Sequence, residues 1–297
     1  MDSAISKKIK SRSEEMKILT KIGDLINYLQ PKLSENKRIG FVPTMGALHE
    51  GHISLITKAQ KDNDIVVVSI FVNPTQFNNP EDLKNYPRTP NEDYRMLREN
   101  NVDVLFSPDE KEIYSSKDKI PDVVLPENII NVMEGIHRPG HFNGVVQIVS
   151  RLFEIVKPLK AYFGEKDFQQ LTVIKSMVKQ LGSKVEIVAC PTIREKNGLA
   201  MSSRNQKLSE KGIEEATEIS KTLFYVRDNW KKFQPAELKK IAIDKIESSG
   251  KLKVEYIEIA DEETLQSVHT WDQSKQIRCF AAVFCEGVRL IDNVKII

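Results

Sequence analysis

The first two thirds of the chain alternate between short apolar runs and longer segments whose apolar residues recur at helical spacing. Residues 65–72 form the longest apolar run and predict a buried strand. Residues 38–43 predict a second strand, and residues 51–61 between them carry apolar side chains at helical spacing. Together these three segments predict a βαβ unit.

The same alternation continues to about residue 190. Further strands are predicted at 102–106, 161–163 and 185–189, and further helices at 92–99, 145–156 and 168–181. Parallel strands need crossover connections, which place helices on the faces of the sheet. We therefore expect an α/β fold whose parallel sheet is covered by helices on both faces.

The pattern changes after about residue 190. Helices are predicted at 210–230 and 235–249, and strands at 254–260, 279–286 and 288–291. We expect a parallel-sheet domain at residues 1–190 followed by a smaller α+β domain at residues 191–297. Residues 1–15 lack the apolar stretch of a secretory signal, so we expect a flexible, charged extension there.

Composition narrows the class of protein without indicating a partner. Hydrophobic residues at 40% and charged residues at 29% argue against a disordered chain. A formal net charge of +2 is too small for a general nucleic-acid binder. The longest apolar run is too short to cross a bilayer, so no membrane association is expected. The three cysteines are scattered without a CxxC pair, which favours a reducing cytoplasm.

Ligands of open parallel sheets gather at the carboxyl ends of the strands. Four polar or glycine- and proline-rich segments follow predicted strands and fall at such places, namely 43–51, 73–90, 164–167 and 191–204. Candidate functional residues are therefore sought in these segments first.

Residues 43–52 read PTMGALHEGH and open a helix. His49 and His52 flank Gly51 at the helix entrance, where unpaired N–H groups and the helix dipole favour phosphate. Imidazole N–H groups can donate to phosphoryl oxygens, and glycine allows a close backbone approach. Short motifs recur by chance, so a pair of polar loop histidines is the alternative. No third ligand at suitable spacing supports a zinc site.

Residues 163–171 read FGEKDFQQL, and they again close a strand and open a helix. Lys166 can supply a point charge for phosphate, and Asp167 can cap the helix or hold a ribose hydroxyl. Gln170 lies one helical turn further along and faces the same crevice. Alone, Lys166 and Asp167 would more often be a solvated pair, but together with the histidine motif they favour a nucleotide site.

Residues 198–205 read GLAMSSRN and combine small residues with two hydroxyls and a guanidinium. Arg204 could compensate the charge of a departing pyrophosphate, while Ser202 and Ser203 donate to nonbridging oxygens. An ordinary surface Ser-Ser-Arg turn is the alternative, since such turns are common by chance.

Residues 71–77 read FVNPTQF and end the apolar strand with two amides. Asn73 and Gln76 could hydrogen-bond a hydroxyl and a carboxylate beside an apolar wall. An Asn-Pro turn with a satisfied glutamine is the alternative. Arg138 and His141, in the later segment EGIHRPGHF, could likewise be ordinary loop residues.

These segments, in this order, resemble the pantothenate synthetase family, which belongs to the nucleotidyltransferase superfamily that also holds class I aminoacyl-tRNA synthetases. The resemblance runs from about residue 38 to residue 293 and includes YPRT at 86–89 and RLIDN at 289–293. It implies a Rossmann-like ATP-binding domain, a smaller lid domain that closes over the site, and usually a homodimer.

The resemblance also implies roles for particular residues. Those that would line the ATP site are Met45, Gly46, Ala47, Leu48, His49, Glu50, Gly51, His52, Gly164, Glu165, Lys166, Asp167, Ile193, Met201, Ser202, Ser203 and Arg204. Within that set, His52 would be the residue usually labelled proton donor. Gln76 and Gln170 resemble the family's pantoate-binding glutamines, Gln76 also lying near β-alanine, with Asn73 and Met45 as neighbours.

The implied reaction is the ATP-dependent joining of pantoate to β-alanine through a pantoyl-adenylate, with release of pyrophosphate and AMP. The residues expected to stabilise the charge that develops on the phosphates are His49, His52, Lys166, Ser202, Ser203 and Arg204. Mg2+ would arrive on the ATP phosphates. Glu92 and Asp93 could assist it, although an acidic first helical turn also suits the helix dipole.

Two other functions stay open. Other HxGH proteins transfer adenylyl to a phosphorylated acceptor, but Asn73 and the two glutamines lack the positive charge that such an acceptor would require. A non-catalytic nucleotide- or RNA-binding module could also use this fold. The near-neutral charge and the lack of an aromatic platform weigh against RNA.

Overall fold

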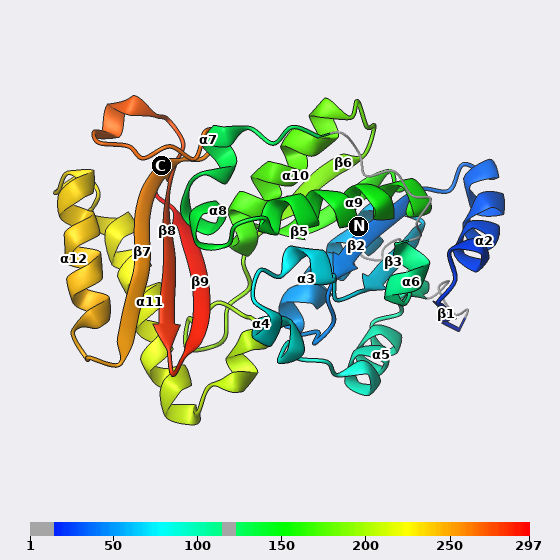
Figure 1. Cartoon of the computed structure of the whole chain (residues 1–297), viewed down its shortest axis with the longest axis horizontal. Coiled ribbons are helices and arrows are strands. Elements are labelled where there is room, and N and C mark those ends of the chain that lie inside the picture. Colours follow the sequence, from blue (N-terminus) through cyan, green and yellow to red (C-terminus); the bar gives the residue numbers. More distant parts are fainter. Residues whose placement is uncertain (1–14, 115–122) are drawn as a thin grey trace, which may run out of the picture. The chain divides into compact units, whose positions relative to one another are not determined.

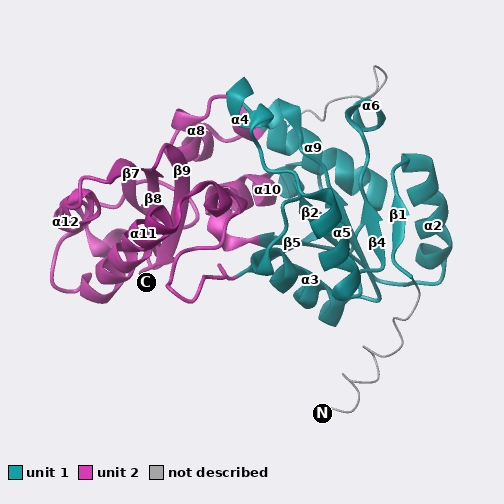
Figure 2. Ribbon diagram, turned by 90° about the horizontal axis from the view of Figure 1, so that it is seen from below, with its two compact units in different colours: residues 1–123, 143–163, 177–190 teal, residues 124–142, 164–176, 191–297 magenta. Residues whose placement is uncertain are grey.

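The computed structural model describes residues 15–114 and 123–297, and the chain divides into two compact units. Unit 1 comprises residues 1–123, 143–163 and 177–190, and unit 2 comprises residues 124–142, 164–176 and 191–297 (Figure 2). The expected N-terminal extension lies outside the described residues except for Glu15. The division into domains at 1–190 and 191–297 stays a prediction. Unit 2 also includes residues 124–142 and 164–176, which come before residue 190.

Unit 1 contains, among its described residues, a six-stranded sheet in the order β1-β4-β3-β2-β5-β6 (Figure 1). The strands are β1 (Lys17–Leu19), β2 (Ile39–Thr44), β3 (Ile65–Ile70), β4 (Val104–Phe106), β5 (Lys160–Gly164) and β6 (Glu186–Cys190). Parallel ladders join β1 to β4, β4 to β3, β3 to β2 and β2 to β5. The first five residues of β3 are all buried, which explains the uninterrupted apolar run because interior parallel strands are covered on both faces.

Helices surround this sheet. The helical segments of unit 1 in the described residues are α2 (Ile22–Ser34), α3 (Glu50–Asp62), η1 (Pro74–Gln76), α4 (Pro80–Lys84), α5 (Pro90–Glu99), α6 (Glu110–Ile113), most of α9 (His141–Val156) and the end of α10 (Phe168–Gln180). On β2, Phe41 meets Phe153 of α9 with ring centroids 6.3 Å apart, while Val42 joins the core cluster containing Ile56 of α3. Because successive strand residues point to opposite faces, α3 and α9 cover opposite faces of the sheet (Figure 2).

The strand order defines where a ligand can bind. From β2 the chain continues to β3 and β4 on one side of the sheet, and later to β5 and β6 on the other. The carboxyl ends of β2 and β5 therefore flank a topological switch point, where open α/β sheets bind their ligands. The histidine motif follows β2, and the segment that begins at Gly164 follows β5.

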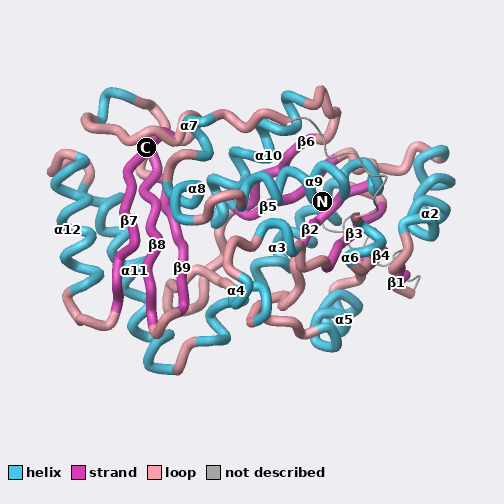
Figure 3. Tube along the Cα trace, in the orientation of Figure 1, coloured by secondary structure: helices cyan, strands magenta, loops and turns pink. Residues whose placement is uncertain are grey.

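Unit 2 contains, in the part of the chain that the structure describes, a three-stranded antiparallel sheet with β8 in the middle (Figure 3). Its strands are β7 (Leu252–Asp261), β8 (Ile277–Cys285) and β9 (Val288–Lys295), and its two long helices are α11 (Glu210–Asn229) and α12 (Pro235–Glu247). Its shorter helical segments are α7 (Glu127–Ile130), α8 (Met133–His137), η2 (Glu165–Asp167), η3 (Ser203–Lys207) and η4 (Trp271–Gln273). Leu223, Leu238 and Ile259 share the core between the two helices and the sheet.

These observations confirm the predicted fold class, a parallel α/β sheet with surrounding helices followed by a smaller α+β part. The described elements that were not predicted include the short edge strand β1, the helix α2 and the short helices α4, α6, α7 and α8. In β1 two of the three residues are exposed, so no apolar run marks it. None of the described helices is both long and apolar enough to cross a bilayer.

Candidate functional site

The chain leaves β2 through a turn with two consecutive left-handed residues. Gly46 has φ +78° and Ala47 has φ +49°. Glycine adopts this region freely, whereas alanine needs support from its surroundings. Part of that support comes from Thr44, whose Oγ1 donates to the carbonyl of Ser69 at 2.7 Å and accepts from the N–H of Gly46 at 3.2 Å.

Asp93 of α5 supplies the rest of the support. Its side chain is buried, and its two oxygens accept from the N–H groups of Ala47 at 2.9 Å and Leu48 at 2.7 Å. Oδ1 also accepts from the hydroxyl of Thr89 at 3.1 Å. The sequence suggested either metal assistance or a dipole effect for this carboxylate. The structure gives it a third role, since it anchors the turn that leads into the histidine motif.

The two histidines cap helix α3 together. The N–H of Gly51 donates to Nδ1 of His49 at 3.1 Å, and the N–H of His49 donates to Nδ1 of His52 at 3.2 Å. The ring centroids lie 4.2 Å apart. An Nδ1 atom that accepts a backbone hydrogen bond carries no proton, so this geometry assigns the neutral tautomer with hydrogen on Nε2 to each ring. Two Nε2–H donors thus stand at the N-terminus of α3, which itself favours an anion.

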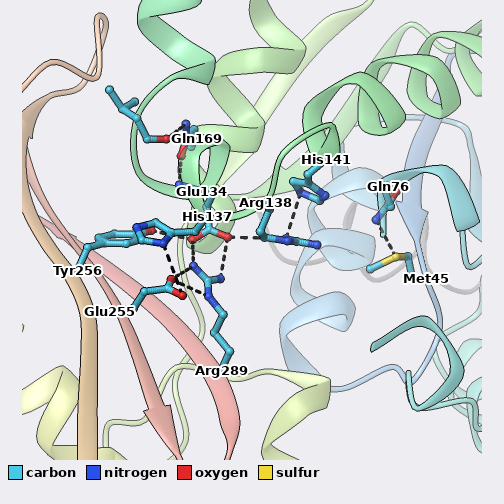
Figure 4. A network of polar contacts seen from close by, with 11 residues as sticks. Met45, Gln76, Glu134, His137, Arg138, His141, Gln169, Glu255, Tyr256 and Arg289 are labelled. Carbon is cyan, nitrogen blue, oxygen red and sulfur yellow. Dashed lines mark hydrogen bonds and ion pairs between the residues drawn. The ribbon is translucent and has the colours of Figure 1, made fainter. Parts of the chain in front are cut away.

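Asn73 and Gln76 differ in how they are held. Asn73 is buried, its Oδ1 accepts from the hydroxyl of Tyr114 at 2.7 Å, and its Nδ2 donates to the carbonyl of Gly144 at 3.0 Å. Its amide therefore holds the η1 turn in place. Gln76 Nε2 instead lies 2.9 Å from the sulfur of Met45, so the structure brings these two predicted neighbours together (Figure 4).

Gly144 permits this arrangement. A Cβ at Gly144 would lie 2.4 Å from the carbonyl oxygen of Thr75 and 2.6 Å from Cα of Gln76. Real Cβ atoms do not come so close to backbone, so only glycine lets α9 approach η1 this tightly. The position of Gln76 consequently depends on a glycine that is far away in the sequence.

In unit 2, the segment after β5 forms the single turn η2 and then enters α10. Lys166, Asp167 and Gln170 line one small cleft together with Arg138, His141 and Asn293. The cleft measures about 30 Å3. That is room for about two water molecules and far less than the several hundred Å3 of a typical ligand pocket. The cleft brings these candidate side chains of unit 2 together around a small space.

The loop that carries the third motif is built as a hairpin. Met201 N–H donates to the carbonyl of Ile193 at 3.0 Å, and Arg194 pairs with Ala200 in a β-bridge. Ser202 then caps η3 by accepting from the N–H of Arg204 at 3.3 Å. Ser203 is buried. Ser202, Ser203 and Arg204 follow one another at the start of η3, and they are not among the residues that line the cleft.

Unit 2 contains a buried charge network that was not predicted from the sequence (Figure 4). Glu134 accepts two hydrogen bonds from Arg289, at 2.7 and 2.8 Å, and a third from the hydroxyl of Tyr256 at 2.8 Å. Arg138 lies 3.7 Å from the same carboxylate. Burial alone would raise the pKa of Glu134, but Arg289, Tyr256 and Arg138 outweigh it and lower the pKa to about 2. Arg289 and Tyr256 lie more than a hundred residues from Glu134 in the sequence, so no local pattern could reveal these pairings.

The described residues include no cluster of three or more His, Cys, Asp or Glu side chains that could hold a metal ion. The histidines of the HxGH motif use Nδ1 for the helix cap, which further distinguishes them from a metal-binding pair.

The fold and these motifs define a class of protein, an α/β protein that presents an HxGH turn at the switch point of its sheet. Comparison with known proteins specifies the family. Residues 17–295 match the family described as Pantoate-beta-alanine ligase, and the chain belongs to it. The predicted resemblance to pantothenate synthetases is thereby confirmed.

Individual relatives cover nearly the whole chain. Pantothenate synthetase of Bacteroides thetaiotaomicron is 48% identical, covering 94% of this chain and 99% of the relative. The Phocaeicola vulgatus enzyme is 50% identical over the same shares. The crystal structure of pantothenate synthetase from Thermus thermophilus is similar with a TM-score of 0.88, 38% identity and coverage of 95% and 99%. The Francisella tularensis ligase, solved with β,γ ATP and β-alanine, is similar with a TM-score of 0.78 and 40% identity. The match covers 94% of this chain and 97% of that ligase.

Asp93→Asn tests the anchor of the turn after β2. One carboxylate oxygen becomes an N–H2 donor that faces backbone N–H groups, so we expect the free energy of unfolding to fall by about 1–3 kcal/mol. Amide hydrogen exchange at Ala47 and Leu48 should accelerate as well. Urea denaturation and exchange measured by NMR provide the two readings. Glu92→Gln, at the exposed neighbouring position, is the control and should stay within about 0.5 kcal/mol of the original protein.

Glu134→Gln tests the charge network through its pH dependence. The folded pKa of about 2 lies below the ordinary value of 4.5, so ionised Glu134 stabilises the fold above about pH 4.5. This contribution is lost as the pH falls from there towards 2. At about 1.4 kcal/mol per unit it amounts to about 3 kcal/mol. We expect the variant to lose correspondingly less stability than the original protein between pH 4.5 and 2 in urea titrations. Parallel profiles of the two proteins would contradict the assignment.

Proposed function

We propose that this chain is an ATP-dependent ligase that joins pantoate to β-alanine through a pantoyl-adenylate. Family membership and near-complete coverage by pantothenate synthetases support the reaction. The observation that carries the chemistry is the double histidine cap of α3, which orients two Nε2–H donors at a helix N-terminus. Such donors suit the charged phosphates of ATP.

In the first step a pantoate carboxylate oxygen attacks the α-phosphorus of ATP. The bond from the α-phosphorus to the oxygen that bridges it to the β-phosphate breaks, and pyrophosphate leaves with that oxygen. Negative charge grows on the phosphates during this step. The residues proposed to stabilise it are His49, His52, Lys166, Ser202, Ser203 and Arg204, all by electrostatics and positioning rather than by a covalent intermediate.

The ATP site would also use the backbone of residues 45–48 and 164–167. At Gly164, φ is −77° and an added Cβ would meet no atom within 4 Å, so the fold itself does not require glycine there. Glycine at such a position suits the close approach of a ligand. Ile193 and Met201 are proposed to line the same nucleotide site.

Gln76 and Gln170 are proposed to orient pantoate, with Met45 beside Gln76. Their amides can donate to the carboxylate and exchange hydrogen bonds with the hydroxyl groups of this acid. Asn73 would act indirectly, by positioning Gln76, because its amide is already engaged in holding the η1 turn that carries Gln76. The side chains of Gln76 and Gln170 are uncharged, which favours a hydroxy acid over a phosphorylated acceptor as the substrate.

In the second step the β-alanine amine attacks the carbonyl carbon of the mixed anhydride. The bond from that carbon to the AMP oxygen breaks, AMP leaves, and the attacking nitrogen loses a proton to give the amide. Mg2+ is proposed to enter as the ATP complex and to neutralise part of its phosphate charge. We also propose a homodimer that works in the cytoplasm.

An omission assay tests this function directly. With ATP, Mg2+, pantoate and β-alanine we expect AMP, pyrophosphate and pantothenate in equal amounts. Without β-alanine, pantoyl-adenylate should remain bound and be detectable by mass spectrometry. Absence of pantoate-dependent pyrophosphate release would favour adenylyl transfer to another acceptor, and nucleotide binding without turnover would favour a binding module.

His52→Asn separates the cap from the phosphate donor. The asparagine Oδ1 can accept from the N–H of His49 as Nδ1 does, but no group replaces Nε2–H. We expect a loss of about a hundredfold or more in the rate of pyrophosphate release, as for removal of a preorganised transition-state donor. The unfolding midpoint should change little. In contrast, His52→Ala should lose both activity and about 1 kcal/mol of stability, because it removes the cap as well.

A further inference from the structure

The last strand of unit 2 holds three of the candidate segments by three different side chains. Arg289, Asp292 and Asn293 lie within five consecutive residues of β9. Arg289 binds Glu134, which precedes Arg138 and His141. Asp292 accepts from Arg194 at 2.6 and 2.9 Å. The motif RLIDN supplies these side chains, and the reaction proposed above assigns none of them a role.

Asn293 contacts the backbone of Lys166, which is a proposed phosphate-binding residue. It is buried, and its Nδ2 donates to the backbone carbonyls of Glu165 and Lys166, both at 2.9 Å. Its Oδ1 accepts from Arg278 at 2.6 Å. The orientation of the amide is thus fixed, because Arg278 can only donate and the two carbonyls can only accept. The amide clamps the η2 turn from which the Lys166 side chain extends.

Arg278 makes the clamp rigid in turn. Its side chain is nearly fully buried, it donates to Glu262 at 2.8 Å, and its guanidinium lies 4.1 Å from the ring centroid of Phe168 at the start of α10. Charge-assisted hydrogen bonds and a buried stacking contact restrict the guanidinium strongly. The position of η2 is therefore determined by side chains of β8 and β9 rather than by the turn itself.

Asp292 holds the hairpin that precedes Ser202 by accepting hydrogen bonds from Arg194. Arg194 spans from this carboxylate to the carbonyl of Gly198 at 3.2 Å, and it stacks on Phe224 with the guanidinium 4.9 Å from the ring centroid. Successive residues of a strand point to opposite faces. Asp292 and Asn293 can therefore hold two separate segments from adjacent positions on an edge strand.

We propose that β9 is the positioning scaffold of the adenylation chemistry, and that Asn293 is a positioning residue that acts through Lys166. This inference rests on the proposed function, which gives Lys166 its role on the phosphates. A displacement of about 1 Å in a catalytic group can reduce a rate about a hundredfold. Loss of the clamp should therefore reduce adenylation while the protein remains folded.

The test uses pantoate-dependent exchange of labelled pyrophosphate into ATP, which reports only the first step. Asn293→Asp keeps the acceptor for Arg278 but turns a negative oxygen towards the two carbonyls. We expect the exchange rate at saturating substrates to fall at least about tenfold. Asn293→Ala removes the same donor without adding charge, and should show the same direction if the aspartate variant fails to fold.

A matched control is Asn63→Ala in unit 1. Asn63 is also a buried asparagine. Its Nδ2 donates to the carbonyl of Ala59 at 2.8 Å and to the hydroxyl of Tyr162 at 2.7 Å, and neither Ala59 nor Tyr162 is a proposed substrate residue. It should lose stability without a change in the exchange rate under conditions where the protein is folded. An equal loss of exchange in Asn63→Ala and Asn293→Ala would overturn a positioning role for Asn293.

Coupling to Lys166 distinguishes positioning from a general effect on structure. If Asn293 acts through Lys166, the double variant Lys166→Ala/Asn293→Asp should exchange within about twofold of Lys166→Ala alone, because residues acting as one unit are not additive. Multiplied losses would overturn the inference while leaving the proposed function intact. Undiminished exchange in Lys166→Ala would instead overturn the role that the proposed function gives to Lys166, and with it the reason for the clamp.

Discussion

The starting points of two candidate segments depend on one constraint, the strand order around β2. From β2 the chain passes to β3 on one side of the sheet, while β5 lies on the other side of β2. The loops that follow β2 and β5 therefore begin at neighbouring strand ends and lead away in different directions. The histidine motif begins at one of these ends and the segment that carries Lys166 begins at the other. Within unit 1, Thr44 and Asp93 fix the turn after β2, and Asn73 and Gly144 fix the η1 turn after β3.

Buried polar side chains hold loop segments in place in both units. Asp93 holds the turn after β2, Glu134 holds the segment before α9, and Asn293 holds the turn after β5. Each is almost fully buried, and each is paired with donors or acceptors far away in the sequence. Because an unpaired buried polar group is costly, such contacts tolerate few alternative loop conformations. Loops held in this way can present polar groups with the accuracy that transition-state stabilisation requires.

The sequence predicted well those features that have a local signal. The buried run of β3, the alternation of strands and helices, and the histidine motif at a strand end were all recognisable, because each depends on neighbours along the chain. The helix boundaries from residue 168 onward agree within two residues with the structure. The short edge strand β1 had no such signal, because only three residues form it and two are exposed.

The supporting contacts of the site could not be predicted in the same way. Asp93 looked like an ordinary acidic residue in the first turn of a helix, and its pairing with the N–H groups of Ala47 and Leu48 depends on the packing of α5. Glu134 and Arg289 are separated by 155 residues. Asn73 was expected to meet a substrate, but its amide is used by the protein itself. Local patterns thus identified candidate ligands more readily than the residues that hold them.

The location of the three anchors on β9 has a consequence for biosynthesis. The ribosome delivers the chain from the N-terminus, and domains generally begin to fold as their residues emerge. Arg289, Asp292 and Asn293 follow all the segments that they secure along the chain, so these segments would remain unsecured until β9 has been synthesised. A product that stops short of β9 would lack all three anchors at once, and premature termination would thus yield an inactive polypeptide instead of a partly competent one.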